Sequence, residues 1–186
     1  MQVLVFDDMT QCTEAEVQRM LPLVSAQRRE QAMKYKHVFG QFCCLKSWVM
    51  LKEGLAVMGY GLRDFEYNEH GKPFIEGGPY FSISHCKEGI AVAINDTQIG
   101  IDIEAIRHAD EDLIARTMNE EERLQVTGYG VPDRMFTRLW THKEAIVKAE
   151  GTGILSFEQL QSIIENRKSK IETIEKEKYI VSIAYE

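Results

Sequence analysis

The chain has 186 residues, and 22 Lys and Arg against 29 Asp and Glu give it a formal net charge of −7. Hydrophobic residues make up 44% and charged residues 27%, which is typical of a soluble globular protein rather than a disordered or fibrous one. No apolar run reaches the roughly 18 residues of a membrane span, and the acidic total argues against nucleic-acid binding. Any anionic ligand would therefore need a local group of basic side chains.

The cysteines and the N-terminal sequence indicate a reducing compartment. Cys12, Cys43, Cys44 and Cys86 form no CxxC pair and no zinc-ligand spacing. The first residues lack a basic segment and contain two aspartates by position 8, unlike a signal peptide. We therefore expect a cytoplasmic protein with reduced thiols, and two disulfides are the alternative.

In chain order, the first half predicts a strand, three helices and then extended segments. The expected elements are a strand over 2–6, helices over 13–21, from Ser25 onward and over 38–58, and extended pieces over 64–67 and 73–75. Thr13 is a suitable N-cap for the first helix. Strands over 80–84, 89–94 and 98–103 follow, and the short turns between them favour an antiparallel meander.

Helices return in the second half, and strands close the chain. The expected elements are helices over 109–117, 119–126 and 132–150 and strands around 171–174 and 178–185. The order is a mixed α+β pattern that roughly repeats. We place the two halves at 1–97 and 98–186.

Two acids lie two positions apart in the predicted strand IGIDIE of residues 99–104. Residues two apart share a face of a strand, so Asp102 and Glu104 would project together while Ile101 and Ile103 point into the core. Neighbouring carboxylates repel each other unless a cation lies between them, and oxygen ligands suit Mg²⁺, which also takes oxygens from a phosphate. The alternative is a solvated strand edge that ends in two acids.

A second candidate segment is LWTHKEAIVK over residues 139–148. On a helix, Trp140, Glu144 and Lys148 lie four apart and share a face. An ordinary Glu-to-Lys ion pair on a helix surface would explain two of them. The neighbouring apolar faces and the Gly-Thr-Gly sequence after the helix instead favour a role in binding metal and phosphate.

The third segment is FSISH over residues 81–85, at the end of a predicted strand. His85 could contact a phosphate as a cation or through a ring N–H, and Ser84 could add its hydroxyl. A nucleophilic Ser–His pair is a poor interpretation because adjacent residues on a strand face opposite ways. A hydrogen-bonded histidine at a strand end is the plain alternative.

Taken together, the segments resemble the 4′-phosphopantetheinyl transferase family, in particular its broad-specificity group of the surfactin-synthetase-activating type. The resemblance rests on GIDIE at 100–104, WTHKEA at 140–145 with Lys148, GKP at 71–73, FSISH at 81–85 and, more loosely, SAQRRE at 25–30. It implies two similar α+β halves in a pseudo-twofold arrangement, with the active site in the cleft between them. It also implies transfer of the phosphopantetheine arm of coenzyme A to a serine of an apo carrier protein, with release of adenosine 3′,5′-bisphosphate.

The resemblance further implies a metal site. By that likeness Asp102, Glu104 and Glu144 would bind Mg²⁺, with Mn²⁺ as an alternative. The nucleophile belongs to the carrier protein, so this chain must supply only a base. Glu144 is the first candidate and Glu122 the second.

The ligands of coenzyme A also follow from the resemblance. Lys143 and Lys148 would bind the pyrophosphate, with Lys148 stabilising the developing charge, and Ser84 would lie near the phosphates. The remaining assignments are Lys72 and Pro73 along the adenine and phosphate region, and His85 and Arg28 at the 3′-phosphate. Gln31 stands where relatives carry a second basic residue for that phosphate, and Arg29, Lys34 or Lys36 could compensate.

The partner implied is an acyl, peptidyl or other carrier protein in its apo form, and the length favours a monomer. One alternative is a holo-synthase restricted to the fatty-acid acyl carrier protein. Another is a module that binds coenzyme A or a nucleotide without catalysis. The physiological carrier and its pathway stay open.

Overall fold

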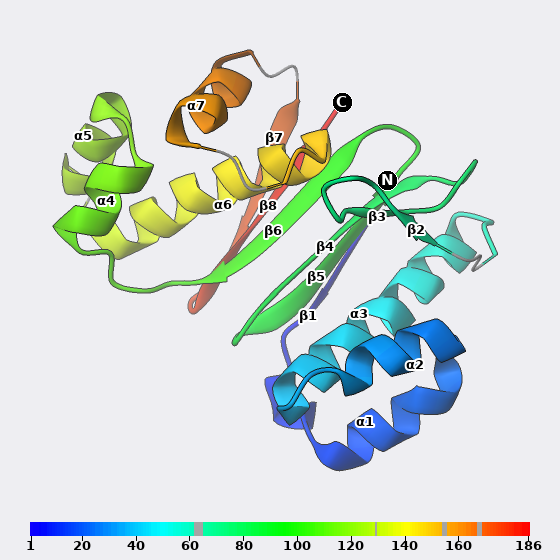
Figure 1. The fold of residues 1–186 in the computed structure, drawn as a ribbon. Helices are drawn as coiled ribbons and strands as arrows, with labels where there is room; N and C mark the ends of the chain where they lie inside the picture. The colour runs from blue at the N-terminus through cyan, green and yellow to red at the C-terminus, as the bar shows by residue number, and fades with distance from the viewer. Residues whose placement is uncertain (62–64, 129, 154–155, 167–168) are drawn as a thin grey trace.

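A computed structural model describes residues 1–61, 65–128, 130–153, 156–166 and 169–186. Two antiparallel sheets of three strands lie at its centre (Figure 1). The first has the order β1–β5–β4 and the second β6–β8–β7. The strands are β1 (Gln2–Phe6), β4 (Tyr80–Cys86), β5 (Gly89–Asn95), β6 (Ile99–Ala105), β7 (Lys170–Glu175) and β8 (Tyr179–Tyr185). The expected mixed α+β class is confirmed.

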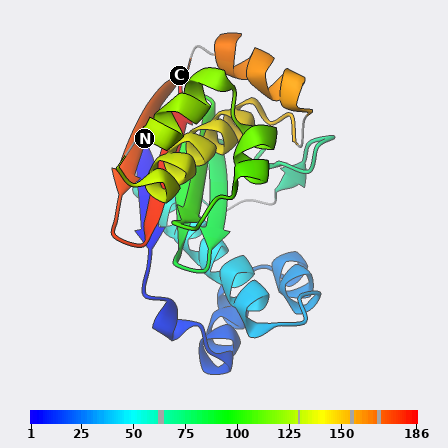
Figure 2. The same cartoon turned by 90° about the vertical axis from the view of Figure 1, so that its left-hand side faces the viewer.

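Each sheet is covered by one long helix. Helix α3 (Val38–Val57) packs on β5 and β1, and α6 (Pro132–Glu150) packs on β6 and β8 (Figure 1). The smaller helices are α1 (Glu14–Met20), α2 (Ala26–Met33), α4 (Glu111–Thr117), α5 (Glu120–Gly128) and α7 (Phe157–Asn166). Helices α1 and α2 pack on α3 and stand apart from the sheets (Figure 2), whereas α5 and α7 pack on α6.

Short elements complete the described chain. A hairpin of β2 (Glu66–Tyr67) and β3 (Pro73–Phe74) stands at the positions where extended pieces were expected, although residue 64 lies outside the described residues. Single 3₁₀ turns occur at Met9–Gln11 and Leu21–Leu23. Among the helices described, none combines the length and apolar character needed to cross a bilayer.

Local capping explains why several helices begin where the sequence predicts. The Thr13 hydroxyl accepts a hydrogen bond from the Glu16 amide at 3.3 Å, and Ser25 accepts one from the Arg28 amide at 3.2 Å. At the start of α5, Asn119 and Glu122 form a reciprocal capping box, with bonds of 2.8 and 2.9 Å. Helix α6 ends at Gly151, whose φ of 73° lies in the left-handed region.

The expected meander is wrong in its third strand. Strand β5 pairs with β1 on one edge and with β4 on the other, so it has no free edge for β6. Strand β6 pairs instead with β8, more than seventy residues later. A pattern of alternating apolar residues identifies strands, but it does not say which strand occupies an edge first.

Helix α7 was not expected from the sequence, although a signal for it exists. The Ser156 amide donates to the Gln159 side chain at 2.9 Å, and the Gln159 amide donates to the Ser156 hydroxyl at 3.3 Å. This Ser-x-x-Gln arrangement is a capping box, which is a recognised sequence signature of a helix start.

The two sheets meet where β4 lies beside β6 (Figure 1). The Ser82 hydroxyl accepts a hydrogen bond from the Ile101 amide at 3.0 Å. On the neighbouring strand β5, Ala91 and Ala93 belong to one buried cluster with the isoleucines of β6. Small residues on β5 therefore leave room for large ones on β6. The division at residue 97 and the pseudo-twofold relation stay predictions.

Helix α6 crosses β6 at Gly100 in backbone-to-backbone contact. A Cβ at this glycine would lie 1.9 Å from the Ala145 carbonyl oxygen and 2.3 Å from the Ala149 amide nitrogen. Ala145 and Ala149 form a buried cluster with Ala184, the residue opposite Gly100 on β8. Small residues on all three elements thus bring the helix close to the sheet.

We predict that Gly100→Ala lowers the free energy of unfolding by about 2–3 kcal/mol, because the new methyl group meets helix backbone that cannot yield. Gly128→Ala is the matched control, since a Cβ there has no atom within 4 Å. Urea unfolding of both variants measures the difference. Equal stabilities would contradict the close contact of α6 with β6.

Candidate active site

A polar cavity of about 460 Å³ lies where the end of β4, strand β6 and helix α6 come together. It collects most of the chemistry expected from the three sequence segments. Its lining comprises Ile83, Ser84, His85, Asp102, Glu104, Arg107, Trp140, Glu144 and Lys148. Residues far apart in sequence thus share one cavity, with three carboxylates facing two basic side chains and a histidine.

Asp102 is at the centre of this cavity and is only 2% exposed. Its Oδ1 accepts hydrogen bonds from the Ser84 hydroxyl at 2.7 Å and from the Lys148 ammonium at 2.6 Å. The Lys148 ammonium also donates to the Ser84 hydroxyl, at 3.1 Å. The second oxygen, Oδ2, is buried and has no hydrogen-bond partner among the described residues. A buried carboxylate oxygen without a partner is costly, and its occurrence points to a missing ligand.

The other two acids, Glu104 and Glu144, have pKa values raised above the ordinary value of a glutamate. Burial raises the pKa of Glu144 above 4.5, and Asp102 adds to this while Lys148 opposes it. Burial also raises the pKa of Glu104, and the neighbouring carboxylates of Asp102 and Glu144 reinforce the shift. The three acids therefore repel one another in a partly desolvated space.

The donor set of this cavity fits a hard divalent cation. Three carboxylates, one of them with an unpartnered oxygen, are the ligands that Mg²⁺ prefers. Within the described parts of the chain, no three acidic, histidine or cysteine side chains are close enough together to hold a metal as they stand. The Lys148 ammonium instead supplies the positive charge at Asp102. The types of residue in the cavity suit a divalent cation, whereas in this structure the Lys148 ammonium binds Asp102.

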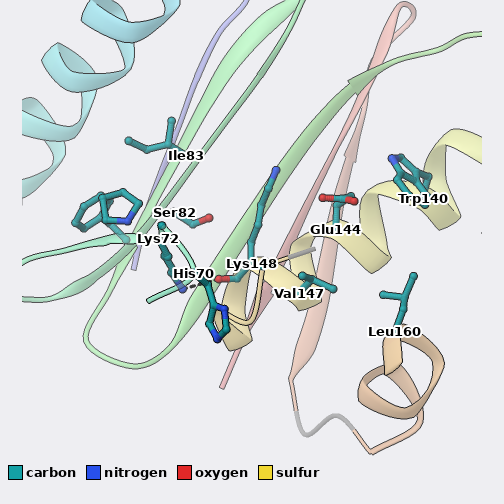
Figure 3. Close-up of a pocket in the computed structure, with 14 residues that line it drawn as sticks. His70, Lys72, Ser82, Ile83, Trp140, Glu144, Val147, Lys148 and Leu160 are labelled. Atoms are coloured by element: carbon teal, nitrogen blue, oxygen red, sulfur yellow. Dashed lines mark hydrogen bonds between the residues drawn. The ribbon is translucent and has the colours of Figure 1, made fainter. Parts of the chain in front are cut away.

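A second cavity of about 400 Å³ adjoins the first and shares Ile83, Trp140, Glu144 and Lys148 with it (Figure 3). Its further walls come from four elements or the turns beside them. They include Lys72, Pro73, Phe81, Val147 and Leu160. An apolar cavity beside a polar one suits a ligand that has an anionic part and a large uncharged part.

The expected ligand Lys72 lines this apolar cavity, but its ammonium group binds backbone carbonyl oxygens. The Nζ atom donates to the carbonyl oxygen of Lys148 at 2.5 Å (Figure 3). It also donates to those of Ala149 at 3.1 Å and Ile99 at 3.4 Å. Burial lowers the pKa of Lys72 to about 8, and Glu150 opposes this shift. The ammonium group thus lies at the C-terminal end of α6.

Lys143 forms an ion pair with Glu122 rather than with the three acids of the polar cavity. The Lys143 ammonium lies 2.7 Å from Glu122 Oε2 and 2.7 Å from the Thr117 carbonyl oxygen, and its side chain is only 3% exposed. Burial lowers the pKa of Lys143, and Glu122 opposes the shift. The residues that the structure describes as lining the two cavities include neither member of this pair.

Arg28 is also placed away from the two cavities. Its guanidinium donates to the Cys44 carbonyl at 2.8 and 3.1 Å and to the Gln31 side chain at 2.8 Å. The same group lies 4.5 Å from the centre of the Trp48 ring, and Arg28 is 8% exposed. His85, the other residue expected at the 3′-phosphate, does line the polar cavity and is exposed.

Sequence reasoning missed several lining residues. Arg107 follows β6 directly, and its charge lies near Glu104. Its position two residues after the acidic strand was the available signal. Ser82 and His70 line the apolar cavity. Ser82 lies inside the FSISH segment and His70 directly precedes the GKP segment, but neither residue was assigned a role.

Comparison with known proteins identifies relatives of this chain. Residues 98–185 match the model of the 4′-phosphopantetheinyl transferase superfamily. A 4′-phosphopantetheinyl transferase of Bacillus subtilis is 31% identical over 75% of this chain and 65% of its own length. The 4′-phosphopantetheinyl transferase gsp of Aneurinibacillus migulanus is 36% identical over 61% of this chain and 53% of its own length. For HetI of Nostoc, also named a 4′-phosphopantetheinyl transferase, the values are 34%, 59% and 51%.

These matches confirm the resemblance expected from the motifs. The matched superfamily region contains Asp102, Glu104, Glu144 and Lys148. The chain spans between half and two thirds of the length of these relatives.

We predict that Glu144→Gln raises the melting temperature at neutral pH, because the amide removes a carboxylate that is desolvated and repelled by Asp102. A carboxyl group whose folded pKa is raised stabilises the fold below its ordinary value of 4.5. That contribution is lost as the pH rises through the folded pKa. The advantage of the variant should therefore be small in acid and grow towards neutral pH. Thermal unfolding from pH 4 to 8 measures it, with the exposed Glu53→Gln as control; equal pH profiles would contradict the raised pKa.

Removing the partner of Lys143 should destabilise the protein strongly. We predict that Glu122→Ala lowers the free energy of unfolding by about 3 kcal/mol, because a buried ammonium loses its counter-charge. The neighbouring Glu121→Ala, at an exposed position of α5, is the control. Urea unfolding compares the two. A loss no larger than that of the control would show that the ion pair does not form in solution.

Proposed function

We propose, from the match of residues 98–185 to the 4′-phosphopantetheinyl transferase superfamily, that this chain is a 4′-phosphopantetheinyl transferase. It moves the phosphopantetheine arm of coenzyme A to a serine of an apo carrier protein and releases adenosine 3′,5′-bisphosphate. The observation that carries the proposal is the polar cavity, where Asp102, Glu104, Glu144, Lys148 and His85 line one space. Three acids and a lysine in one cavity are the parts that a metal-assisted phosphoryl-type transfer needs.

The two cavities fit the two parts of coenzyme A. We assign its pyrophosphate to the polar cavity, where the Lys148 ammonium and the Ser84 hydroxyl already lie 3.1 Å apart. Lys148 neutralises charge on the leaving bisphosphate. His85 is available to the 3′-phosphate at the exposed side of the same cavity. The adenine lies along Pro73 in the apolar cavity, against the carbon chain of Lys72.

Asp102, Glu104 and Glu144 would hold Mg²⁺ or Mn²⁺, which supplies charge neutralisation at the pyrophosphate when bound. The support for this assignment is Oδ2 of Asp102, which is buried and has no hydrogen-bond partner among the residues that the structure describes.

The reaction needs a base for the serine hydroxyl of the carrier protein. Its oxygen forms a bond to the β-phosphorus of coenzyme A while the bond from that phosphorus to the bridging oxygen breaks, and the hydroxyl proton passes to the base. We assign this role to Glu144, because it lines both cavities and so lies beside the pyrophosphate in this proposal. Glu122 is the weaker candidate, since its carboxylate is committed to Lys143 and to the cap of α5.

The partner in this proposal is an apo carrier protein of acyl, peptidyl or other type, and the enzyme is a cytoplasmic monomer. Carrier proteins tend to be acidic and this chain carries −7, so docking relies on a local surface rather than on long-range attraction.

The proposal is tested by incubating the chain with coenzyme A, Mg²⁺ and several apo carrier proteins, followed by mass spectrometry of the carriers. We expect addition of the phosphopantetheine arm, and we expect Asp102→Asn to lower the rate by about 100-fold or more while the protein stays folded. Asp96→Asn, at an exposed turn, is the matched control.

Each outcome of this assay separates one interpretation from another. Modification of the fatty-acid acyl carrier protein alone would establish the restricted holo-synthase. Binding of coenzyme A without transfer to any carrier would establish a non-catalytic module and contradict the proposed function. An unchanged rate for Asp102→Asn would remove Asp102 from the site.

A further inference from the structure

The C-terminal end of helix α6 contacts the turn of residues 68–72, which connects β2 to β3. The last four carbonyl groups of a helix lack partners within the helix. In α6, the Val147 carbonyl is taken by the Gly151 amide at 2.9 Å, while those of Lys148 and Ala149 accept from the Lys72 ammonium. The Gly151 carbonyl, just beyond the helix, accepts from Asn68 Nδ2 at 3.0 Å.

The turn that supplies these donors is itself tightly held. Asn68 Oδ1 accepts hydrogen bonds from the His70 amide at 3.0 Å and from the Lys72 amide at 2.8 Å. The Asn68 amide donates to the Lys72 carbonyl at 2.9 Å, and Gly71 adopts a φ of 82° that favours glycine. Asn68 therefore uses one side-chain atom to shape the turn and the other to bind the end of α6.

The turn and the helix end lie in close contact at Gly151 and Gly153. A Cβ at Gly151 would lie 3.2 Å from Lys72 Cδ and 3.3 Å from Asn68 Nδ2. At Gly153, the nearest atom to such a Cβ is in His70, also at 3.2 Å. A positive charge at a helix C-terminus is also favourable for the helix dipole. Shape and charge thus both favour this contact.

The contact bears directly on the polar cavity. The backbone carbonyl of Lys148 is bound by Lys72 (Figure 3). The side chain of the same residue reaches Asp102 and Ser84. Glu144 lies one helical turn earlier and lines both cavities. A contact that fixes the end of α6 therefore also fixes the backbone positions from which the Lys148 and Glu144 side chains extend.

We propose that Asn68 and Lys72 are positioning residues: the turn 68–72 caps α6 from outside and holds Lys148 in place for the phosphates of coenzyme A. The inference rests on the proposed function for its ligand, and it differs from a direct role of Lys72 as a phosphate ligand. Lys72 acts through the backbone of Lys148, to which its ammonium group donates.

The first test needs no ligand. In Lys72→Met the carbon chain is kept and the ammonium is lost. We expect the amides in the last turn of α6 to exchange with solvent at least about tenfold faster, since their local opening is no longer opposed by the cap. Lys52→Met, an exposed lysine of α3, is the matched control. Unchanged exchange in Lys72→Met would overturn the proposal, whether or not the chain binds coenzyme A.

The second test distinguishes positioning from direct binding. Calorimetry with coenzyme A should show Kd raised about tenfold by Lys72→Met, a typical loss for residues that orient a ligand-binding group. In a Lys148→Ala background the same substitution should have no further effect, because its effect passes through Lys148. An undiminished tenfold loss in that background would assign Lys72 to the ligand and overturn the proposal. Failure of the wild-type chain to bind coenzyme A would instead contradict the proposed function.

Two further variants keep the test decisive if Lys72→Met unfolds. Asn68→Asp keeps the oxygen that shapes the turn but replaces the amide that binds Gly151 by a carboxylate, and we expect it to speed the same amide exchange. Lys72→Arg restores a cation and should return exchange towards the wild-type rate. Normal exchange in Asn68→Asp, or no rescue by arginine, would contradict the cap.

Discussion

The close approach of α6 to β6 at Gly100 is the constraint on which the site depends. With Ala145 and Ala149 against the glycine, the helix lies near enough for Lys148 to reach Asp102 at 2.6 Å. A side chain at position 100 would push the helix away and separate the two segments that carry the acids. The glycine of the IGIDIE segment is thus explained by packing, while the aspartate two residues later is explained by chemistry.

The site that results is poorly satisfied as a folded structure. Asp102 has a buried oxygen with no hydrogen-bond partner in the described parts of the chain. The pKa values of Glu104 and Glu144 are raised by burial and by neighbouring acids. Regions that violate the usual rules of polar satisfaction are where function is expected. In contrast, the Lys143 ammonium donates to both Glu122 and the Thr117 carbonyl, and this ion pair joins α5 to α6. Under the proposed function, the side of α6 that faces Asp102, rather than the side that carries Lys143, is therefore the reactive one.

Sequence patterns predicted what depends on local geometry. Alternation along β6 placed Ile101 and Ile103 in the core and Asp102 on the face towards the cavity, as the structure shows. The sequence also predicted helices from residues 13, 25 and 119, and the structure has capping hydrogen bonds at the starts of α1, α2 and α5. Sequence reasoning did not predict the pairing of β6 with β8, because the choice of edge depends on strands far away in the chain.

The sequence also did not predict which groups the long cationic side chains bind. Lys72, Lys143 and Arg28 were all expected at phosphates, yet each donates to protein carbonyl groups. A flexible ammonium or guanidinium binds whichever acceptors the tertiary fold exposes, and helix ends expose several. Lys148 differs because its ammonium group binds two residues that line the polar cavity, Ser84 on β4 and Asp102 on β6.

The placement of these lysines changes what the net charge of −7 means for ligand binding. Three acids lie in the polar cavity, and the Lys148 ammonium already offsets one of them. Under the proposed function, a divalent cation and Lys148 compete for Asp102, because both require its oxygens. A cation at the partnerless Oδ2 would release the ammonium from part of that interaction and leave it free for an anionic phosphate. Metal and coenzyme A should then favour each other's binding. The metal neutralises acids that would repel coenzyme A, and the phosphates of coenzyme A bind the ammonium that competes with the metal.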